Sequence, residues 1–272
     1  MCSGAFLNIM IYPKNFKQAD IYRNSGQTKK AIKLYNIVFK EENKKRNCRI
    51  AAEALQQTGV SYKIDNDTKN AIKYLKKANK YSATNHIQEI AGGSLRDIGI
   101  TYEYIKKYDL AEKYLLQSEK ILKDTKDKAN YAITLAKIGM VKTRKKDYKD
   151  AKKYIIYALK ILNKTNSWFF TATSLGHLAD LQIEIGKYSN AIKTLRKAKA
   201  ILDSKKQQKI HTRRYAQYYG LMAYSYAKIG ELKLAELNLE KSKELIKKYL
   251  SKTAAEIVYN DIRVQETERL IK

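Results

Sequence analysis

The sequence is poor in proline and cysteine, with one proline, Pro13, and two cysteines, Cys2 and Cys48, in 272 residues. Two cysteines are too few for a disulfide framework and show no metal-site spacing, a usage that suits a reducing compartment. No stretch approaches the ~18 consecutive apolar residues that a membrane-spanning helix needs. The apolar start, residues 1–12, lacks the basic region that opens a signal peptide. These absences predict a cytoplasmic protein without a membrane span.

Catalytic motifs are also missing. The three histidines, His86, His177 and His211, lie far apart, and there is no HExxH pair, glycine-rich phosphate loop or nucleophile elbow. Adjacent acids such as Glu41 and Glu42 point about 100° apart on a helix, so they do not face each other. We therefore expect no enzymatic activity, no bound metal and no cofactor.

Acidic residues are scarce relative to basic ones, since 27 Asp and Glu against 55 Lys and Arg give a net charge of +28. Such a surplus indicates that the chain binds a partner of negative charge, which is nucleic acid, an anionic surface or an acidic protein. The alternative is a merely solvated face in a lysine-rich chain. Lysine greatly outnumbers arginine, which weakens specific phosphate recognition because the guanidinium fork makes the bidentate contacts.

What the sequence does contain is a helical pattern, clearest at residues 55–78. Three residues with i, i+4, i+7 spacing form one helix face, and three more with the same spacing form a second face. They are Leu55, Gly59 and Tyr62, followed by Ala71, Leu75 and Ala78. Between them, residues 65–68 (Asp-Asn-Asp-Thr) break the pattern and offer side chains that cap a helix start. The small residues Gly59 and Ala71 allow two antiparallel helices to approach closely.

The same pattern returns six times, at intervals of 40, 40, 40, 40 and 44 residues. The small residues of the second helices are Ala31, Ala71, Ala111, Ala151, Ala191 and Ala235. The small residues of the first helices, twelve positions earlier, are Ala19, Gly59, Gly99, Gly139, Ala179 and Ala223. The large residues, four positions after the small residue of each second helix, are Tyr35, Leu75, Leu115, Ile155, Leu195 and Leu239.

This pattern resembles the tetratricopeptide repeat, in a long version of about 40 residues. The resemblance implies an all-α protein, an α-solenoid of six tandem helical hairpins in a right-handed superhelix with a C-terminal capping helix. We expect an N-terminal cap at residues 1–12, the six repeats at 13–252 and the C-terminal helix at 253–272. That last stretch is interpreted either as a solvating helix or as the first helix of an incomplete seventh repeat.

The resemblance also implies where a ligand would bind. In such proteins the first helices line a concave groove, and the residues at fixed offsets from their small residue point inward. Carried onto this sequence, the candidate ligand-binding residues are Asp20, Arg23, Gln56, Val60, Lys63, Arg96, Ile100, Glu103, Met140, Thr143, Asp180 and Tyr224.

The candidates change character along the chain, because basic residues come first, apolar residues occupy the middle, and Asp180 and Tyr224 follow. The basic members are Arg23, Lys63 and Arg96, and the apolar members are Val60, Ile100 and Met140. A segment with an apolar centre and an acidic end would complement this series. Alternatively, Val60 and Ile100 pack between neighbouring first helices. The paired lysines and asparagines with which some relatives hold a terminal carboxylate are absent.

The resemblance implies a non-enzymatic scaffold that binds a protein or peptide, as in peptide-sensing bacterial regulators and in the sensing parts of bacterial signalling proteins. The alternative function is binding of RNA or DNA through the basic surface. One aromatic cluster, Ser-Trp-Phe-Phe at residues 167–170, either packs the connection to the preceding helix or forms an exposed anchor for a partner.

Overall fold

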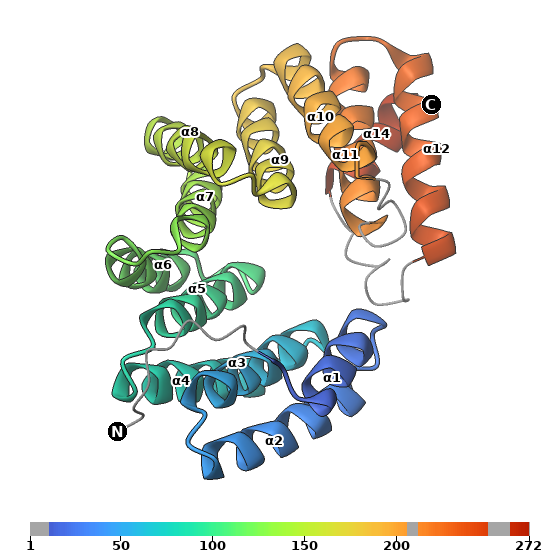
Figure 1. Ribbon diagram of the computed structural model, residues 1–272. Helices are drawn as coiled ribbons and strands as arrows, with labels where there is room; N and C mark the ends of the chain where they lie inside the picture. Colours follow the sequence, from blue (N-terminus) through green and yellow to red (C-terminus); the bar gives the residue numbers. More distant parts are fainter. Residues whose placement is uncertain (1–10, 206–211, 250–261, 272) are drawn as a thin grey trace. The chain divides into compact units, whose positions relative to one another are not determined.

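The computed structural model describes residues 11–205, 212–249 and 262–271, and all regular structure in these ranges is helical (Figure 1). The helices are α1 (Lys14–Asn24), α2 (Thr28–Lys44), α3 (Cys48–Ile64), α4 (Thr68–Thr84), α5 (Gln88–Tyr104), α6 (Tyr108–Leu122), α7 (Lys128–Arg144), α8 (Tyr148–Lys164), α9 (Trp168–Glu184), α10 (Tyr188–Asp203), α11 (Thr212–Lys228), α12 (Leu232–Tyr249) and α14 (Ile262–Ile271). Successive helices pack as hairpins, for example α5 with α6 and α11 with α12. The predicted all-α fold of tandem hairpins is confirmed.

Most connections are three-residue turns whose middle residue is left-handed. After α3, the amide of Asn66 (φ 61°) donates to the carbonyl of Lys63 at 3.1 Å. The amide of Asp67 donates to the carbonyl of Tyr62 at 2.9 Å. These two bonds form a Schellman motif, which satisfies the last carbonyls of a helix. Asp67 then caps α4, because its carboxylate accepts from the amide of Asn70 at 3.0 Å. The predicted turn therefore ends one helix and starts the next.

The small residues of the pattern lie where the two helices of a hairpin come closest. A Cβ added to Gly99 would lie 2.7 Å from Cγ of Leu115 and 3.0 Å from the carbonyl oxygen of Ala111. All six alanines predicted at this position of the second helices are fully buried. The same close approach to the large residue of the second helix occurs between Gly59 and Leu75 and between Gly139 and Ile155, as the sequence pattern predicts.

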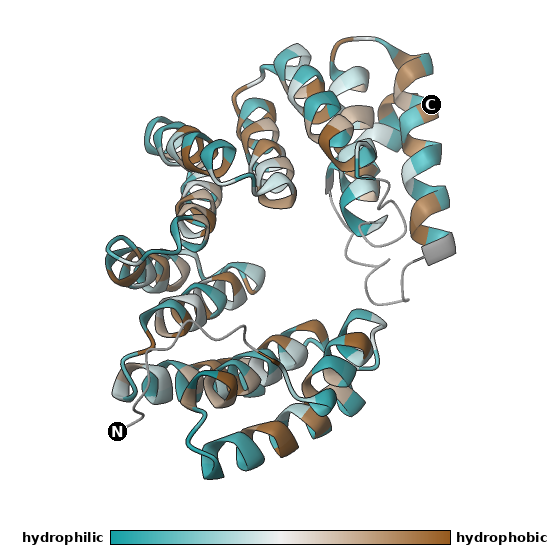
Figure 2. Ribbon diagram, in the orientation of Figure 1, coloured by the Kyte–Doolittle hydropathy of each residue, from teal (hydrophilic) through white to brown (hydrophobic). Residues whose placement is uncertain are grey.

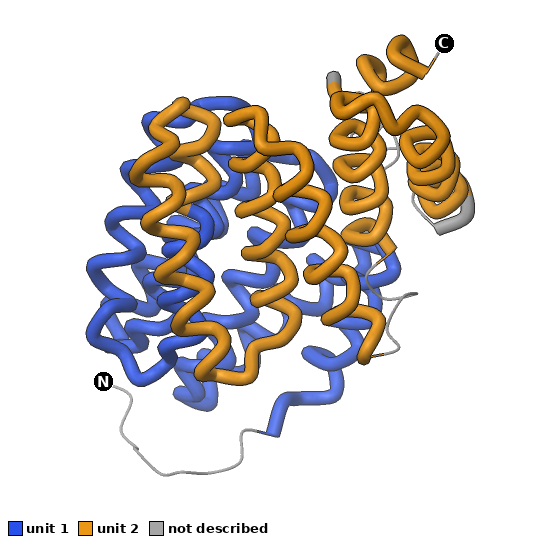
Figure 3. Tube along the Cα trace, turned by 90° about the horizontal axis from the view of Figure 1, so that it is seen from above, with its two compact units in different colours: residues 1–137 blue, residues 138–272 orange. Residues whose placement is uncertain are grey.

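The chain divides into two compact units, residues 1–137 and 138–272, with the boundary inside α7 (Figure 3). In the first unit, Leu75, Leu95 and Ile98 form a cluster shared by α4 and α5. In the second, Tyr215 and Tyr218 of α11 are among the largest fully buried side chains. Figure 2 shows hydrophobic and hydrophilic residues alternating along the helices, as expected for helices that are each buried on one side.

The aromatic cluster of α9 divides between the core and the surface. Trp168 and Phe169 are half-buried and pack against the core of the second unit, while Phe170 is 39% exposed. Lys142 of α7 occupies the position that Tyr62 and Tyr102 hold in α3 and α5, and its side chain is 14% exposed. Its Nζ lies 2.8 Å from a carboxylate oxygen of Asp147 and 3.6 Å from one of Asp150.

The two ends of the chain are described only in part. The predicted N-terminal cap lies outside the described residues except for its last two, of which Tyr12 packs on Phe16 with ring centroids 4.7 Å apart. Cys2, His211 and residues 250–261 also lie outside them. At the other end, α14 packs mainly against α11, and its Val264 joins Ala223 and Leu239 in a small cluster. The predicted boundaries at residues 12 and 252 stay predictions.

Candidate functional site

All twelve candidate residues lie on first helices. Within each compact unit, we call the candidates and the side chains that contact them the first-helix face of that unit. α1 carries Asp20 and Arg23; α3 carries Gln56, Val60 and Lys63; α5 carries Arg96, Ile100 and Glu103; α7 carries Met140 and Thr143; α9 carries Asp180; and α11 carries Tyr224.

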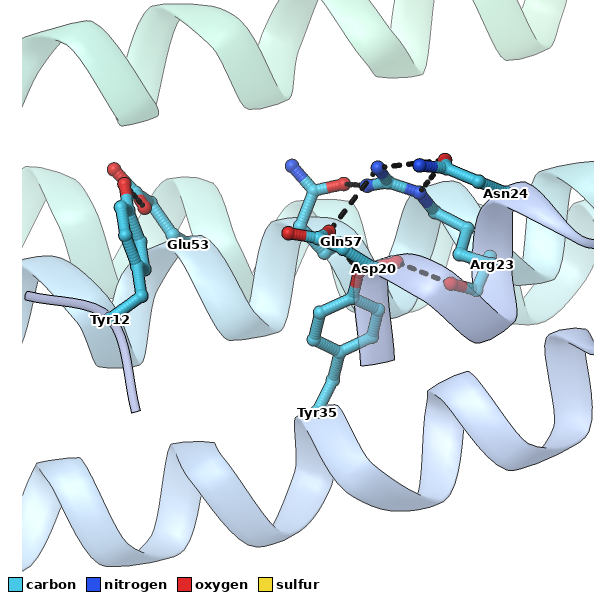
Figure 4. Close-up of polar contacts among 8 residues, drawn as sticks. Tyr12, Asp20, Arg23, Asn24, Tyr35, Glu53 and Gln57 are labelled. Atoms are coloured by element: carbon cyan, nitrogen blue, oxygen red, sulfur yellow. Dashed lines mark hydrogen bonds and ion pairs between the residues drawn. The ribbon is translucent and has the colours of Figure 1, made fainter. Parts of the chain in front are cut away.

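In the first unit, α1 and α3 are joined by polar side chains (Figure 4). The hydroxyl of Tyr35 donates to Asp20 at 2.5 Å, and Asp20 also lies 3.2 Å from the guanidinium of Arg23. Arg23 in turn donates to the side-chain oxygen of Gln57 on α3. The pKa of Tyr35 is raised, first because of its burial and then because of the bond to Asp20. Arg23 is therefore fixed by neighbours rather than unpaired.

A second polar contact lies at the other end of α3 (Figure 4). Tyr12 donates to Glu53 at 2.5 Å, and Arg49 lies 3.8 Å from the same carboxylate and 3.5 Å from Glu89 of α5. Burial raises the pKa of Glu53, and the Tyr12 bond and the Arg49 charge oppose that rise. Glu53 of α3 is thus a half-buried carboxylate that has one hydrogen bond from Tyr12 and one nearby positive charge from Arg49.

Further along the face, α3, α5 and α7 are linked in the same way. Gln56 donates to Asp97 at 2.9 Å, and Lys63 lies 3.8 Å from the other oxygen of that carboxylate. Arg96 donates to the side-chain oxygen of Asn130 on α7. Arg23 and Lys63 therefore each lie beside a carboxylate, whereas Arg96 contacts a neutral amide. Two of the three basic candidates thus have an acidic partner within the chain.

The apolar candidates differ in burial. Val60 is half-buried and packs against the cluster of Leu75 and Leu95, which is the packing role considered as its alternative. Ile100 is half-buried on the same face, whereas Met140 is 8% exposed. The candidate Glu103 is half-buried. Thr143 is buried, and its hydroxyl donates to the carbonyl of Gly139 at 2.9 Å. Their roles in ligand binding stay predictions.

In the second unit, Asp180 is the centre of an ion-pair cluster. Its side chain is 9% exposed, and one oxygen lies 2.7 Å from the guanidinium of Arg144. The other oxygen contacts Arg263 of α14, 83 residues along the chain. Arg144 also lies 3.7 Å from Glu184. A buried carboxylate between two guanidinium groups has its desolvation offset by charge-assisted hydrogen bonds.

Tyr224 also contacts α14. Its hydroxyl lies 3.2 Å from Glu266, and the ammonium of Lys228 lies 2.5 Å from the same carboxylate. The hydrogen bond from Lys228 is the main reason that the pKa of Glu266 is lowered, and the same bond raises the pKa of Lys228. Burial raises the pKa of Tyr224. Two of the twelve candidates, Asp180 and Tyr224, are therefore already in contact with α14.

Several residues of this face were not among the candidates. They are Gln57, Asp97, Asn130, Arg144, Lys228, Arg263 and Glu266. Two offsets from the small first-helix residue would have found part of this set. Two positions before it lie Gln57 and Asp97, and five positions after it lie Arg144 and Lys228. The partners on α14 had no such signal, because they come from outside the six repeats.

Within residues 11–205, 212–249 and 262–271, no group of three or more His, Cys, Asp or Glu side chains is arranged to hold a metal ion. Among the same residues, no helix is both long and apolar enough to cross a membrane.

The fold defines an α-helical repeat protein with hairpins of two 15- to 18-residue helices in most repeats. Two models of the tetratricopeptide repeat match the chain, at residues 52–85 and at 130–204. These two segments are therefore tetratricopeptide repeats. No curated protein sequence matches it significantly.

Solved structures of repeat proteins share this fold. The apo form of RapI has a TM-score of 0.65 and 18% identity, covering 94% of this chain and 97% of its own. The signal transduction ATPase PH0952 from Pyrococcus horikoshii, described as having a tetratricopeptide repeat sensor, has a TM-score of 0.63 and 20% identity over 94% of this chain and 38% of its own. BtubC from P. vanneervenii has a TM-score of 0.62 and 13% identity, over 86% of this chain and 91% of its own. These likenesses concern the fold.

Proposed function

We propose that the chain is a non-enzymatic scaffold that binds a protein or peptide segment on its first-helix face, in the cytoplasm. The observation that carries this proposal is the position of α14. This helix is held by the hydrogen bond from Arg263 to Asp180 and by the one from Tyr224 to Glu266. Val264 adds an apolar contact. A face that holds one helix by this chemistry supports the binding of another by the same means.

In the first unit, the polar side chains of the face are pre-organised. Arg23, Gln56 and Lys63 are each held by a contact to a neighbouring side chain, and all three are at most partly exposed. Binding would therefore cost little additional side-chain entropy, which is the general advantage of a preformed site. The partner we infer is a segment of mixed charge with apolar residues, rather than the segment with one acidic end that the sequence favours.

A signalling role is the finer part of the proposal. We infer that the chain is the sensing part of a bacterial signalling or regulatory protein. The likeness to RapI and to the repeat sensor of PH0952 supports this inference at the level of fold.

Site-specific photo-crosslinking in cells tests the proposal. A photoreactive amino acid at Ile100, half-buried on α5, is compared with the same amino acid at Leu116, 40% exposed on α6. A protein captured from position 100 and absent at position 116 supports binding on the first-helix face. Capture only from position 116, or no difference between the positions, would refute it.

The captured protein is then titrated against purified variants. The double variant Lys63→Gln, Arg96→Gln removes two charges of the first-helix face, and Lys73→Gln, Lys80→Gln removes two from the exposed side of α4 as a matched control. We expect the first pair to weaken binding about fivefold or more, as for interface residues that contribute at least ~1 kcal/mol. Equal affinity of both pairs would end the assignment to this face.

A further inference from the structure

Each second helix has an outward stripe on the side opposite its buried alanine. Since a helix turns about 100° per residue, the residues at positions −2, +2, +5 and +9 from that alanine lie within about 40° of the opposite side. From α2 to α10 the stripe residues are Lys29, Lys33, Asn36 and Lys40; Lys69, Lys73, Lys76 and Lys80; Asp109, Lys113, Leu116 and Lys120; Lys149, Lys153, Ile156 and Lys160; and Ser189, Lys193, Arg196 and Ala200. All except Asn36 are exposed.

The stripes are far more basic than the composition requires. Fourteen of these twenty positions carry lysine or arginine and one carries an acid, whereas 55 basic residues in 272 would place about four there. The positions two after the alanine are lysine in five successive repeats, Lys33, Lys73, Lys113, Lys153 and Lys193. Within the described ranges, no stripe lysine forms an ion pair.

The last second helix shows that lysine content alone does not create the stripe. α12 has five lysines, as many as α4. Four of the five lysines of α4 lie on its stripe, but the stripe of α12 is Lys233, Leu237, Glu240 and Glu244. The lysines of α2 to α10 are therefore placed on one side of the helices. A lysine-rich composition by itself would have affected α12 equally.

Two exposed aliphatic residues interrupt the basic stripes. Leu116 is 40% exposed between Lys113 and Lys120 on α6, and Ile156 is 46% exposed between Lys153 and Lys160 on α8. Phosphate groups of a nucleic acid give such side chains no apolar environment. The boundary between headgroups and acyl chains of a bilayer does, and basic residues beside apolar ones are typical of helices that lie on anionic membranes.

We propose that the outward stripes of the second helices bind the surface of an anionic bilayer, with lysines on the lipid headgroups and with Leu116 and Ile156 entering the interface. Seven residues along a helix separate the paired lysines by about 10 Å. In the first unit, α2 and α4 are neighbours, because Phe39 and Tyr81 pack edge to face with ring centroids 5.7 Å apart. The lysines of these helices thus form a two-dimensional array, which suits a sheet of headgroup charges.

Co-sedimentation with lipid vesicles tests the proposal. Vesicles of phosphatidylcholine alone are compared with vesicles that also contain phosphatidylserine, at a physiological ionic strength of about 0.15 M. The stripe variant is Lys73→Glu, Lys80→Glu, Lys120→Glu. The control, Lys14→Glu, Lys106→Glu, Lys126→Glu, changes the net charge equally at exposed residues outside the second helices. We expect the stripe variant to bind phosphatidylserine vesicles about 100-fold more weakly and the control less than about fivefold more weakly.

The aliphatic residues separate a bilayer from a nucleic acid. Leu116→Ser with Ile156→Ser should weaken vesicle binding about tenfold while leaving binding to a double-stranded RNA unchanged, because only the bilayer offers an apolar phase. Circular dichroism confirms that each variant is folded. Three results would overturn the proposal: no binding to phosphatidylserine vesicles, equal losses in the stripe and control variants, or a stripe dependence that appears with RNA and not with vesicles.

Discussion

One added methyl group at Gly99 should destabilise the protein, although alanine forms helices better than glycine. The Cβ of Gly99→Ala would lie 2.7 Å from Cγ of Leu115 and 3.0 Å from the carbonyl oxygen of Ala111. The side chain can shift, but the carbonyl belongs to the backbone of α6 and cannot rotate away. The two helices of the hairpin must therefore move apart.

The magnitude follows from two opposing terms. Replacing glycine by alanine inside a helix contributes about 1 kcal/mol of stability, and overpacking a tight contact costs about 1 to 3 kcal/mol. The net change should be a loss of about 1 kcal/mol. Gly220 of α11 is the matched control, because its added Cβ would meet Ser242 at 3.5 Å and Val264 at 4.0 Å, which are ordinary contacts. Gly220→Ala should therefore raise stability by up to about 1 kcal/mol.

Urea unfolding followed by far-ultraviolet circular dichroism measures both variants. A double-mutant cycle with Leu115→Ala identifies the source of the loss, since removal of Cγ and its methyl groups should make Gly99→Ala cheaper by at least about 0.5 kcal/mol. The reasoning is refuted if Gly99→Ala stabilises the protein as much as Gly220→Ala. It also fails if the cost at Gly99 is the same in both backgrounds.

Three further predictions concern a turn, a buried tyrosine and the C-terminal helix. Lys146 has φ 64°, a left-handed conformation that glycine adopts at lower cost than a residue with a side chain. Lys146→Gly should therefore raise the unfolding free energy, measured by thermal melts, by about 0.5 to 1 kcal/mol. In the same measurement Lys152→Gly, inside α8, should lower it by about 1 kcal/mol. Burial raises the pKa of Tyr218 from 10.0 to about 12. The unfolded chain then ionises first, so this contribution, up to about 3 kcal/mol, is present below pH ~10 and is lost as the pH rises to ~12. Tyr218→Phe should flatten that part of the stability profile, and an unchanged alkaline slope would contradict this assignment. Asp180→Asn weakens the contact to Arg263, and amide hydrogen exchange in residues 262–271 should become about tenfold faster; unchanged protection there would show that α14 is held by other contacts.

The helices and their pairing into hairpins could be predicted because their signals are local. Apolar residues spaced three and four apart define one face of a helix whatever surrounds it. A small residue at a fixed place, such as Gly99 or Ala111, predicts close approach because only its size matters. The turns were harder, since Lys106 and Lys146 take the left-handed conformation that favours glycine, and tertiary context overrides that preference.

The position of the candidates on first helices could also be predicted from the sequence, but most of their contact partners could not. Gln56 and Asp97 are 41 residues apart, and Asp180 and Arg263 are 83 apart. Helical periodicity determines which side of its own helix a residue occupies. It does not determine which residue of a neighbouring helix lies within 3 Å, because that depends on the lateral packing of whole helices. Of the partners of the basic candidates, Asp20 lies three residues from Arg23 on the same helix and could be predicted, whereas Gln57, Asp97 and Asn130 were placed beside Arg23, Lys63 and Arg96 only by the tertiary structure.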